Sequence, residues 1–98
     1  MNEEQAAAVF HSMGDTTRIS IIFLLHQKGP LNAGTIASNF THISRPAISY
    51  HLKILKDVKV ISATKKGQEV EYSLEKQWLI ALLKETATQL EPSTALQQ

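Results

Sequence analysis

The 98-residue chain has no cysteine, few prolines and glycines, and no long apolar run. The missing cysteine excludes disulfide bonds, thiolate catalysis, thiol redox sensing and any zinc site with cysteine ligands. The apolar stretch from Ile21 to Leu25 is far too short to cross a bilayer. The start of the chain, Met-Asn-Glu-Glu-Gln, lacks the basic residues and apolar run of a secretory signal. We therefore expect a cytoplasmic protein with no membrane partner.

Signatures of catalysis are also lacking. The chain has no cysteine nucleophile, no glycine-rich phosphate loop and no paired carboxylates placed for acid–base chemistry. His11, His26 and His42 show no spacing typical of a metal-binding pair. We therefore expect neither an enzyme nor a bound cofactor or metal.

Positive charge is concentrated in one part of the chain. The net charge is only +1, but positions 44–66 carry +5, so the rest carries −4. The basic residues in this segment are Arg45, Lys53, Lys56, Lys59, Lys65 and Lys66, against the single acid Asp57. Such segregation is typical of a surface that meets a polyanion, although a solvated helix face is the alternative.

The hydrophobic periodicity and the breaks predict one domain over residues 1–98 with five helices and a hairpin. Asp15, Asn32 and Ser44 are the expected N-caps of the second, third and fourth helices. The ranges are Glu3 to Met13 for the first helix, Asp15 to about Gly29 for the second, a short third helix after Asn32, 44–58 for the fourth, 60–73 for the hairpin and 75–90 for the last.

Apolar residues at helical spacing define the expected core. Ile19, Ile22, Phe23 and Leu25 are expected to form the buried face of the second helix. The order α-α-α-α-β-β-α is mainly helical with a small β-hairpin, which predicts a winged helix-turn-helix. In that fold the fourth helix is the recognition helix and the hairpin is the wing.

Three segments resemble motifs of the ArsR/SmtB family of homodimeric transcriptional repressors. The segment 9–18, VFHSMGDTTR, resembles the family's opening F-x-x-L-G-D-P-T-R. The segment 44–55, SRPAISYHLKIL, is similar to its recognition-helix signature S-x-x-x-[VI]-S-x-H-L-x-x-L, and 66–74, KGQEVEYSL, resembles its wing, K-G-x-x-x-x-Y-x-L. The three segments lie in the family's order and spacing. The resemblance implies a repressor that binds a palindromic DNA operator as a homodimer.

The chain departs from the metal-responsive members of that family. Their third helix carries a pair of cysteines, where this chain has Asn32 and Gly34. Other members bind ions between the last helices with Asp, His and Glu, but from Trp78 onward this chain has only Glu85 and Glu91. We therefore expect a variant that is not a metal sensor.

The exposed face of the fourth helix supplies the expected DNA contacts. Arg45 is the first candidate for a base contact, most naturally to guanine. Ser49 and Tyr50 suit a base edge, a thymine methyl group or a phosphate, with Pro46 beside them. Ser44 and Lys53 suit backbone phosphates.

Two further predictions on DNA binding leave alternatives open. His51 lies at the border of the core face, so it either touches a phosphate or holds the helix against the domain. Lys65 and Lys66 flank the turn of the wing and suit a minor groove or its phosphates, although a solubilising turn is the alternative.

The last helix is the candidate for the dimer interface. Its apolar side chains exceed what so thin a domain hides within itself, although part of the stripe packs against the second helix. The expected interface residues are Phe10, Trp78, Leu79, Leu82, Leu83 and Leu90.

The patterns leave one alternative function, a winged helix that binds a protein partner through its last helix and not DNA. The basic face around Arg45, Ser49 and Lys53 favours DNA. An effector is left open as an unknown small molecule or protein, with control by the repressor's own concentration as a third route.

Overall fold

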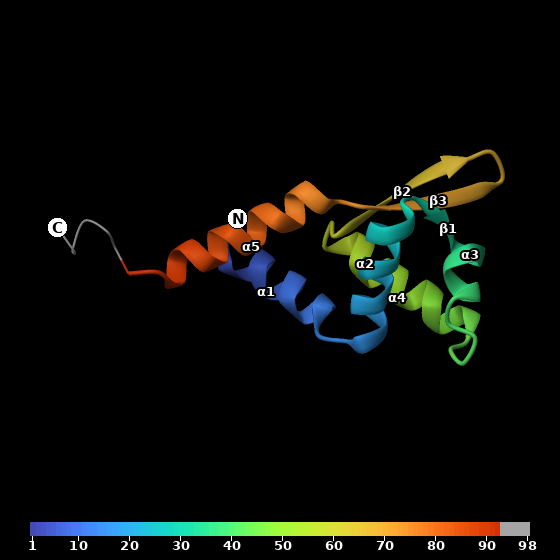
Figure 1. The fold of residues 1–98 in the computed structure, drawn as a ribbon, viewed down its shortest axis with the longest axis horizontal. Helices are drawn as coiled ribbons and strands as arrows, with labels where there is room; N and C mark the ends of the chain where they lie inside the picture. Colours follow the sequence, from blue (N-terminus) through green and yellow to red (C-terminus); the bar gives the residue numbers. More distant parts are fainter. Residues whose placement is uncertain (93–98) are drawn as a thin grey trace.

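The computed structural model describes residues 1–92, and positions 93–98 of the predicted domain lie outside the described residues. Within residues 1–92 the chain forms five helices and three strands (Figure 1). They are α1 (Glu3–Met13), α2 (Thr16–Lys28), β1 (Leu31–Asn32), α3 (Ala33–Ser38), α4 (Arg45–Asp57), β2 (Ile61–Lys66), β3 (Glu69–Leu74) and α5 (Lys76–Leu90). This is the predicted winged helix-turn-helix with one strand added.

Side-chain caps set the starts of the helices at the predicted positions. Asp15 Oδ2 accepts a hydrogen bond from the Arg18 amide at 3.1 Å, which begins α2. Asn32 Oδ1 accepts from the amide of Thr35 at 2.8 Å to begin α3. Ser44 Oγ accepts from the Ala47 amide at 3.2 Å to begin α4. Each cap satisfies an amide that has no partner within its helix.

The sheet has three strands where two were predicted. β2 and β3 form the expected antiparallel hairpin, from Ile61 opposite Leu74 to Lys66 opposite Glu69. The added strand, β1, pairs antiparallel with β3 and places Leu31 opposite Tyr72, so the order is β1-β3-β2. A strand of two residues is too short to show an alternating pattern in the sequence. Its effect is to tie the start of α3 to the base of the wing.

The core lies where α1, α2, α4 and the base of the hairpin meet. Its fully buried side chains include Ile21, Ile36, Leu52 and Leu55. The prediction that Phe23 belongs to the buried face of α2 is wrong, because this side chain is 59% exposed. Phe23 lies two positions, or about 200°, around the helix from Ile21, on the opposite face.

Helix α5 runs away from the recognition helix and the wing, with α1 beside it (Figure 1). Leu79 and Leu82 are buried in the chain's own core. A side chain covered within one chain offers little surface to a second copy, so these two residues contribute less to the predicted interface than the exposed ones. The remaining predicted interface residues keep accessible surface: Phe10, Leu83 and Leu90 are exposed, and Trp78 is half-buried.

Helix α4 ends in a Schellman motif with an unusual residue. The Val60 amide donates to the carbonyl of Leu55 and the Lys59 amide to that of Lys56, both at 3.0 Å. Lys59 has a φ of 68°, the left-handed conformation that glycine normally supplies at this position. A lysine there carries a modest conformational strain.

Candidate nucleic-acid interface

Helix α4 divides into a buried and an exposed face. Ile48, Leu52 and Leu55 anchor one face in the core. The other face presents the predicted contact residues to solvent, because Arg45, Pro46, Ser49, Tyr50 and Lys53 are all exposed. Since the core holds the helix from behind, this face is free to enter a groove.

Lys53 is paired on the surface of the helix. Its Nζ lies 2.7 Å from Asp57 Oδ2, one helical turn away. The hydrogen bond from Lys53 to Asp57 and the charge of that carboxylate raise the pKa of Lys53, so the side chain is a cation at neutral pH. Both side chains are exposed, so breaking this pair costs little free energy.

The tip of the wing is a second cationic surface. Lys65 and Lys66 are exposed at the end of β2, and Gly67 makes the turn with a φ of 63°. Lys66 stands opposite Glu69 in the sheet, but the Glu69 carboxylate accepts a hydrogen bond from Asn32 Nδ2 at 3.1 Å. Within the described part of the chain, neither lysine forms an ion pair.

His51 is held by a residue that the sequence analysis left without a role. Arg18 Nη1 lies 3.0 Å from His51 Nδ1, and Arg18 Nε donates to the carbonyl of Ser12. Arg18 is 9% exposed and is the one charged residue among the buried side chains of residues 1–92. The sequence does contain a signal for this role. Arg18 shares a helical face with Ile21, Ile22 and Leu25, and an arginine on a core face needs a buried partner.

Asp15 completes this corner between α1 and α2. The hydrogen bond from the Arg18 amide is the main cause that lowers the pKa of Asp15, and the nearby His51 and the positive charge of Arg18 act in the same direction. The carboxylate Oδ2 lies 4.0 Å from His51 Nδ1. Asp15 is therefore ionised at neutral pH and balances the charge of the buried guanidinium.

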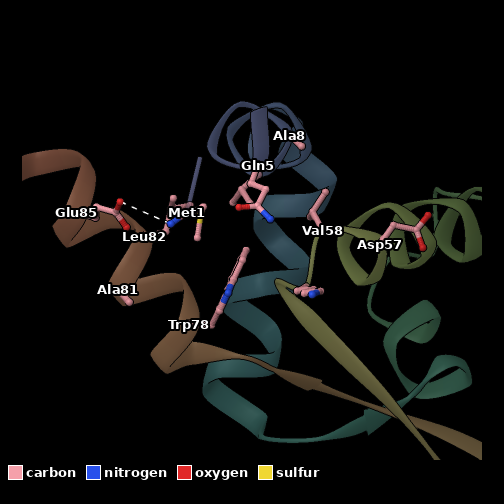
Figure 2. Close-up of a pocket in the computed structure, with 11 residues that line it drawn as sticks. Met1, Gln5, Ala8, Asp57, Val58, Trp78, Ala81, Leu82 and Glu85 are labelled. Atoms are coloured by element: carbon pink, nitrogen blue, oxygen red, sulfur yellow. Dashed lines mark ion pairs between the residues drawn. The ribbon is translucent and has the colours of Figure 1, made fainter. Parts of the chain in front are cut away.

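A hollow of about 470 Å³ opens between α1, α5 and the end of α4 (Figure 2). Figure 2 shows Gln5 of α1 and Trp78 of α5 directed into this space, with Val58 at the end of α4 beside them. An ion pair of 3.9 Å between the amino terminus and Glu85 closes one side. The hollow thus touches both the recognition helix and the helix that carries the exposed apolar side chains.

Residues 1–92 lack both a cluster of metal ligands and a membrane-spanning helix. No group of three or more His, Cys, Asp or Glu side chains lies close enough together to hold a metal ion. No helix in this part of the chain has the length and hydropathy needed to span a membrane.

Comparison with known proteins identifies the family. Residues 15–63 match the family model described as bacterial regulatory protein, arsR family. The transcriptional repressor SdpR of Bacillus subtilis is 50% identical over 66 residues, which cover 67% of this chain and 71% of SdpR. The chain belongs to the ArsR family. The matched segment contains the whole helix-turn-helix, from the cap of α2 into β2.

Solved structures of ArsR-type regulators have the same fold. One ArsR family transcriptional regulator gives a TM-score of 0.79 at 26% identity, with 91% of this chain and 90% of that one covered. A homodimeric winged helix-turn-helix domain from Mycobacterium bovis gives 0.69 at 27% identity, covering 90% and 83%. The fold class and family expected from the sequence are therefore confirmed.

Family membership establishes the general activity. The chain is a DNA-binding transcriptional regulator, and the expectation that it is not an enzyme is confirmed because the ArsR relatives are regulators.

Proposed function

We propose that the chain is a repressor that binds a palindromic operator as a homodimer and does not sense metals. One observation carries the proposal: the solvent-facing side of α4 is polar and cationic, while its other side is fixed in the core. A helix held in this way suits the major groove, where base edges can be read. The relative SdpR is named a transcriptional repressor, which supports repression.

The proposed contacts follow from position on α4 and the wing. Arg45 reads a guanine from the exposed first turn, and Ser49 and Tyr50, with Pro46 beside them, face the neighbouring bases or sugar–phosphate backbone. Lys53 and the capping Ser44 bind phosphates. The wing lysines, Lys65 and Lys66, contact the adjacent minor groove or its phosphates.

The proposed dimer interface is smaller than the sequence analysis expected. Phe10, Leu83 and Leu90 are exposed apolar side chains on α1 and α5, and Trp78 lies half-buried on α5. Covering such residues with a second copy removes apolar surface from water. The homodimeric state of the Mycobacterium bovis domain supports this arrangement. Two-fold symmetry then requires a palindromic operator.

Independence from metals is supported by the residues at the positions where metal-responsive members of the family carry their cysteine ligands. Asn32 caps α3 through Oδ1 and binds Glu69 through Nδ2, so its side chain is occupied in holding the wing. Gly34 has no side chain, and the chain has no cysteine. The test is operator affinity with added zinc and with chelator, and a stoichiometric change with zinc contradicts this part of the proposal.

If no metal releases the repressor from DNA, three routes of control remain: a small organic effector, a protein partner, or the concentration of the repressor itself. The hollow beside Trp78 supports the organic effector, because a ligand there contacts the end of α4 and also α1 and α5. Linkage requires that such a ligand bind the DNA-free dimer more tightly than the DNA-bound dimer. Trp78 is the only tryptophan, so its fluorescence must change over the same concentrations that release DNA. Release with no change in this fluorescence contradicts the placement.

The decisive experiment selects bound sequences from a random DNA pool and then measures affinity by fluorescence anisotropy. The proposal predicts an enriched palindrome that binds far more tightly than a random duplex. Arg45→Ala is expected to lose the preference at one position in each half-site, at a cost of about 1 to 3 kcal/mol. Equal affinity for the selected and random duplexes contradicts the proposal and favours the alternative, a winged helix that binds a protein.

A further inference from the structure

The contact between Arg18 and His51 determines where the imidazole carries its proton. A guanidinium group has five N–H donors and no acceptor. The 3.0 Å contact between Arg18 Nη1 and His51 Nδ1 is therefore a hydrogen bond only if Nδ1 is unprotonated and accepts. A neutral imidazole with a bare Nδ1 carries its hydrogen on Nε2.

The other nitrogen of the ring is a free donor. His51 Nε2 forms no hydrogen bond within residues 1–92. This part of the chain also has no fully buried side-chain nitrogen or oxygen without a partner, so Nε2 keeps some contact with solvent. The side chain as a whole is 15% exposed. One nitrogen of the His51 ring, Nδ1, is thus held by Arg18, while the other, Nε2, is free to donate a hydrogen bond from the recognition helix.

We propose that Arg18 is a positioning residue that holds His51 as the Nε2–H tautomer, so that the neutral imidazole donates a hydrogen bond to a DNA phosphate. The inference rests on the proposed function, because it adds a contact to the same DNA-binding surface. It also joins the two alternatives left open for His51, since one ring nitrogen anchors the helix while the other binds DNA.

The corner between α1 and α2 is built to hold this arrangement. The guanidinium is fixed from a second side by the carbonyl of Ser12, and the ionised Asp15 balances its charge. Arg18 cannot lose its proton, so it presents only donors at any pH at which the protein is folded. Asp15 Oδ2 also faces His51 Nδ1, but at 4.0 Å it lies beyond hydrogen-bond distance, whereas Arg18 Nη1 is 3.0 Å away. The nearer partner of Nδ1 is therefore a permanent cation that can only donate.

Direct observation of the tautomer needs no variant. In a long-range ¹H–¹⁵N spectrum of the wild type at a pH of about 8, above the usual titration range of histidine, we expect His51 to show a protonated Nε2 and a bare Nδ1. The exposed His26 provides a control, for which we expect the averaged pattern of a free imidazole. A protonated Nδ1 on His51, or an averaged pattern there, overturns the proposal.

Two substitutions of His51 separate the anchoring role from the DNA contact. His51→Asn keeps an acceptor near the Nδ1 position but does not reach the Nε2 position, so we expect normal thermal stability and weak DNA binding. His51→Gln places an amide donor near the Nε2 position but offers Arg18 no acceptor at Nδ1, so we expect lower stability and stronger DNA binding than His51→Asn shows. The reverse order of DNA affinities, or wild-type affinity for both variants, overturns the proposal.

The salt dependence identifies the charge state of the contact. A hydrogen bond to a charged group corresponds to about tenfold in affinity, so a dimer that makes two such contacts loses about 100-fold with His51→Asn. Because the contact is to a phosphate and not to a base, the loss should be equal for operator and random DNA. Because a neutral donor releases no counterion, the slope of log affinity against log salt should not change. A flatter slope for His51→Asn means a cationic contact and contradicts the neutral tautomer.

Arg18→Lys tests the positioning role. The shorter ammonium should lose the contact with Nδ1, so the His51 tautomer becomes averaged and DNA affinity falls by less than it does with His51→Asn. A folded Arg18→Lys protein that keeps a pure Nε2–H tautomer overturns the role of Arg18. If the wild type fails to prefer its selected operator, the proposed function fails instead, and the tautomer spectrum still tests this inference separately.

Discussion

Neutralising the wing lysines should change the salt dependence of DNA binding in a way that can be calculated from the structure. Each protomer presents three exposed lysines that are assigned to the DNA backbone, Lys53, Lys65 and Lys66. If each neutralises one phosphate, a dimer releases counterions from six, and the slope of log affinity against log salt is about −5. The double variant Lys65→Gln, Lys66→Gln removes two thirds of these contacts, so its slope should be about −1.8.

The same arithmetic gives the loss of affinity. At a salt concentration of about 0.15 M, each phosphate contact corresponds to about 5.5-fold in affinity, so four lost contacts lower it about 900-fold. The loss should be the same for operator and random DNA, because the lysines bind the backbone and not bases. Fluorescence anisotropy titrations at five or more salt concentrations measure both quantities.

A control with matched charge comes from α5. The double variant Lys76→Gln, Lys84→Gln removes the same charge from exposed positions outside the proposed surface. Its slope should equal that of the wild type. If both double variants lower the slope equally, the effect is one of net charge, and the assignment of the wing to DNA is refuted.

Three further predictions concern stability and assembly. Lys59→Gly should raise the free energy of unfolding by about 1 kcal/mol, because glycine adopts the φ of 68° without strain; unchanged or lower stability in urea contradicts this. Leu82→Ala should lower the free energy of unfolding by about 2 to 5 kcal/mol, because the side chain is buried in the core. Its exposed neighbour should behave differently: Leu83→Glu should keep the helical circular dichroism spectrum and weaken the dimer about a hundredfold in sedimentation experiments. A dimer of unchanged affinity removes Leu83 from the interface. Asp15→Asn keeps the cap but loses the charge. Since the folded-state pKa of Asp15 is lowered, the carboxylate stabilises the folded protein at pH values above its ordinary pKa of 3.8, and this stabilisation is lost as the pH falls through the lowered pKa. A difference in stability between the wild type and Asp15→Asn that persists at the lowest pH contradicts this reasoning.

The helices and the hairpin could be predicted because their signals are local. Asp15, Asn32 and Ser44 are cap residues just before apolar periodicity, and the structure begins a helix after each of them. The exposed face of α4 follows from the same periodicity, since Ile48, Leu52 and Leu55 define the face that must be buried. Such features depend on residues within one or two turns of each other.

The features that were missed depend on long-range contacts. β1 exists only because Leu31 and Asn32 meet Tyr72 and Glu71, about forty positions along the chain. The partner of Arg18 is 33 residues away, and no local pattern in α2 or α4 names it.

The apolar stripe of α5 shows the same limit. Leu82 and Leu83 are neighbours in sequence and equally apolar, but one is 2% exposed and the other 42%. The amphipathic pattern indicates that both need covering. It does not distinguish a partner in the same chain from a partner in a second copy.

Methylation interference at guanine N7 tests the central claim most directly, that two copies of α4 read successive major grooves of one operator. N7 lies in the major groove and is the expected partner of Arg45. The account predicts interference in two clusters on one face of the duplex, about 10 base pairs apart, and Arg45→Ala should abolish it at one guanine in each cluster. Interference at no guanine N7, or in a single cluster without a symmetric counterpart, contradicts it.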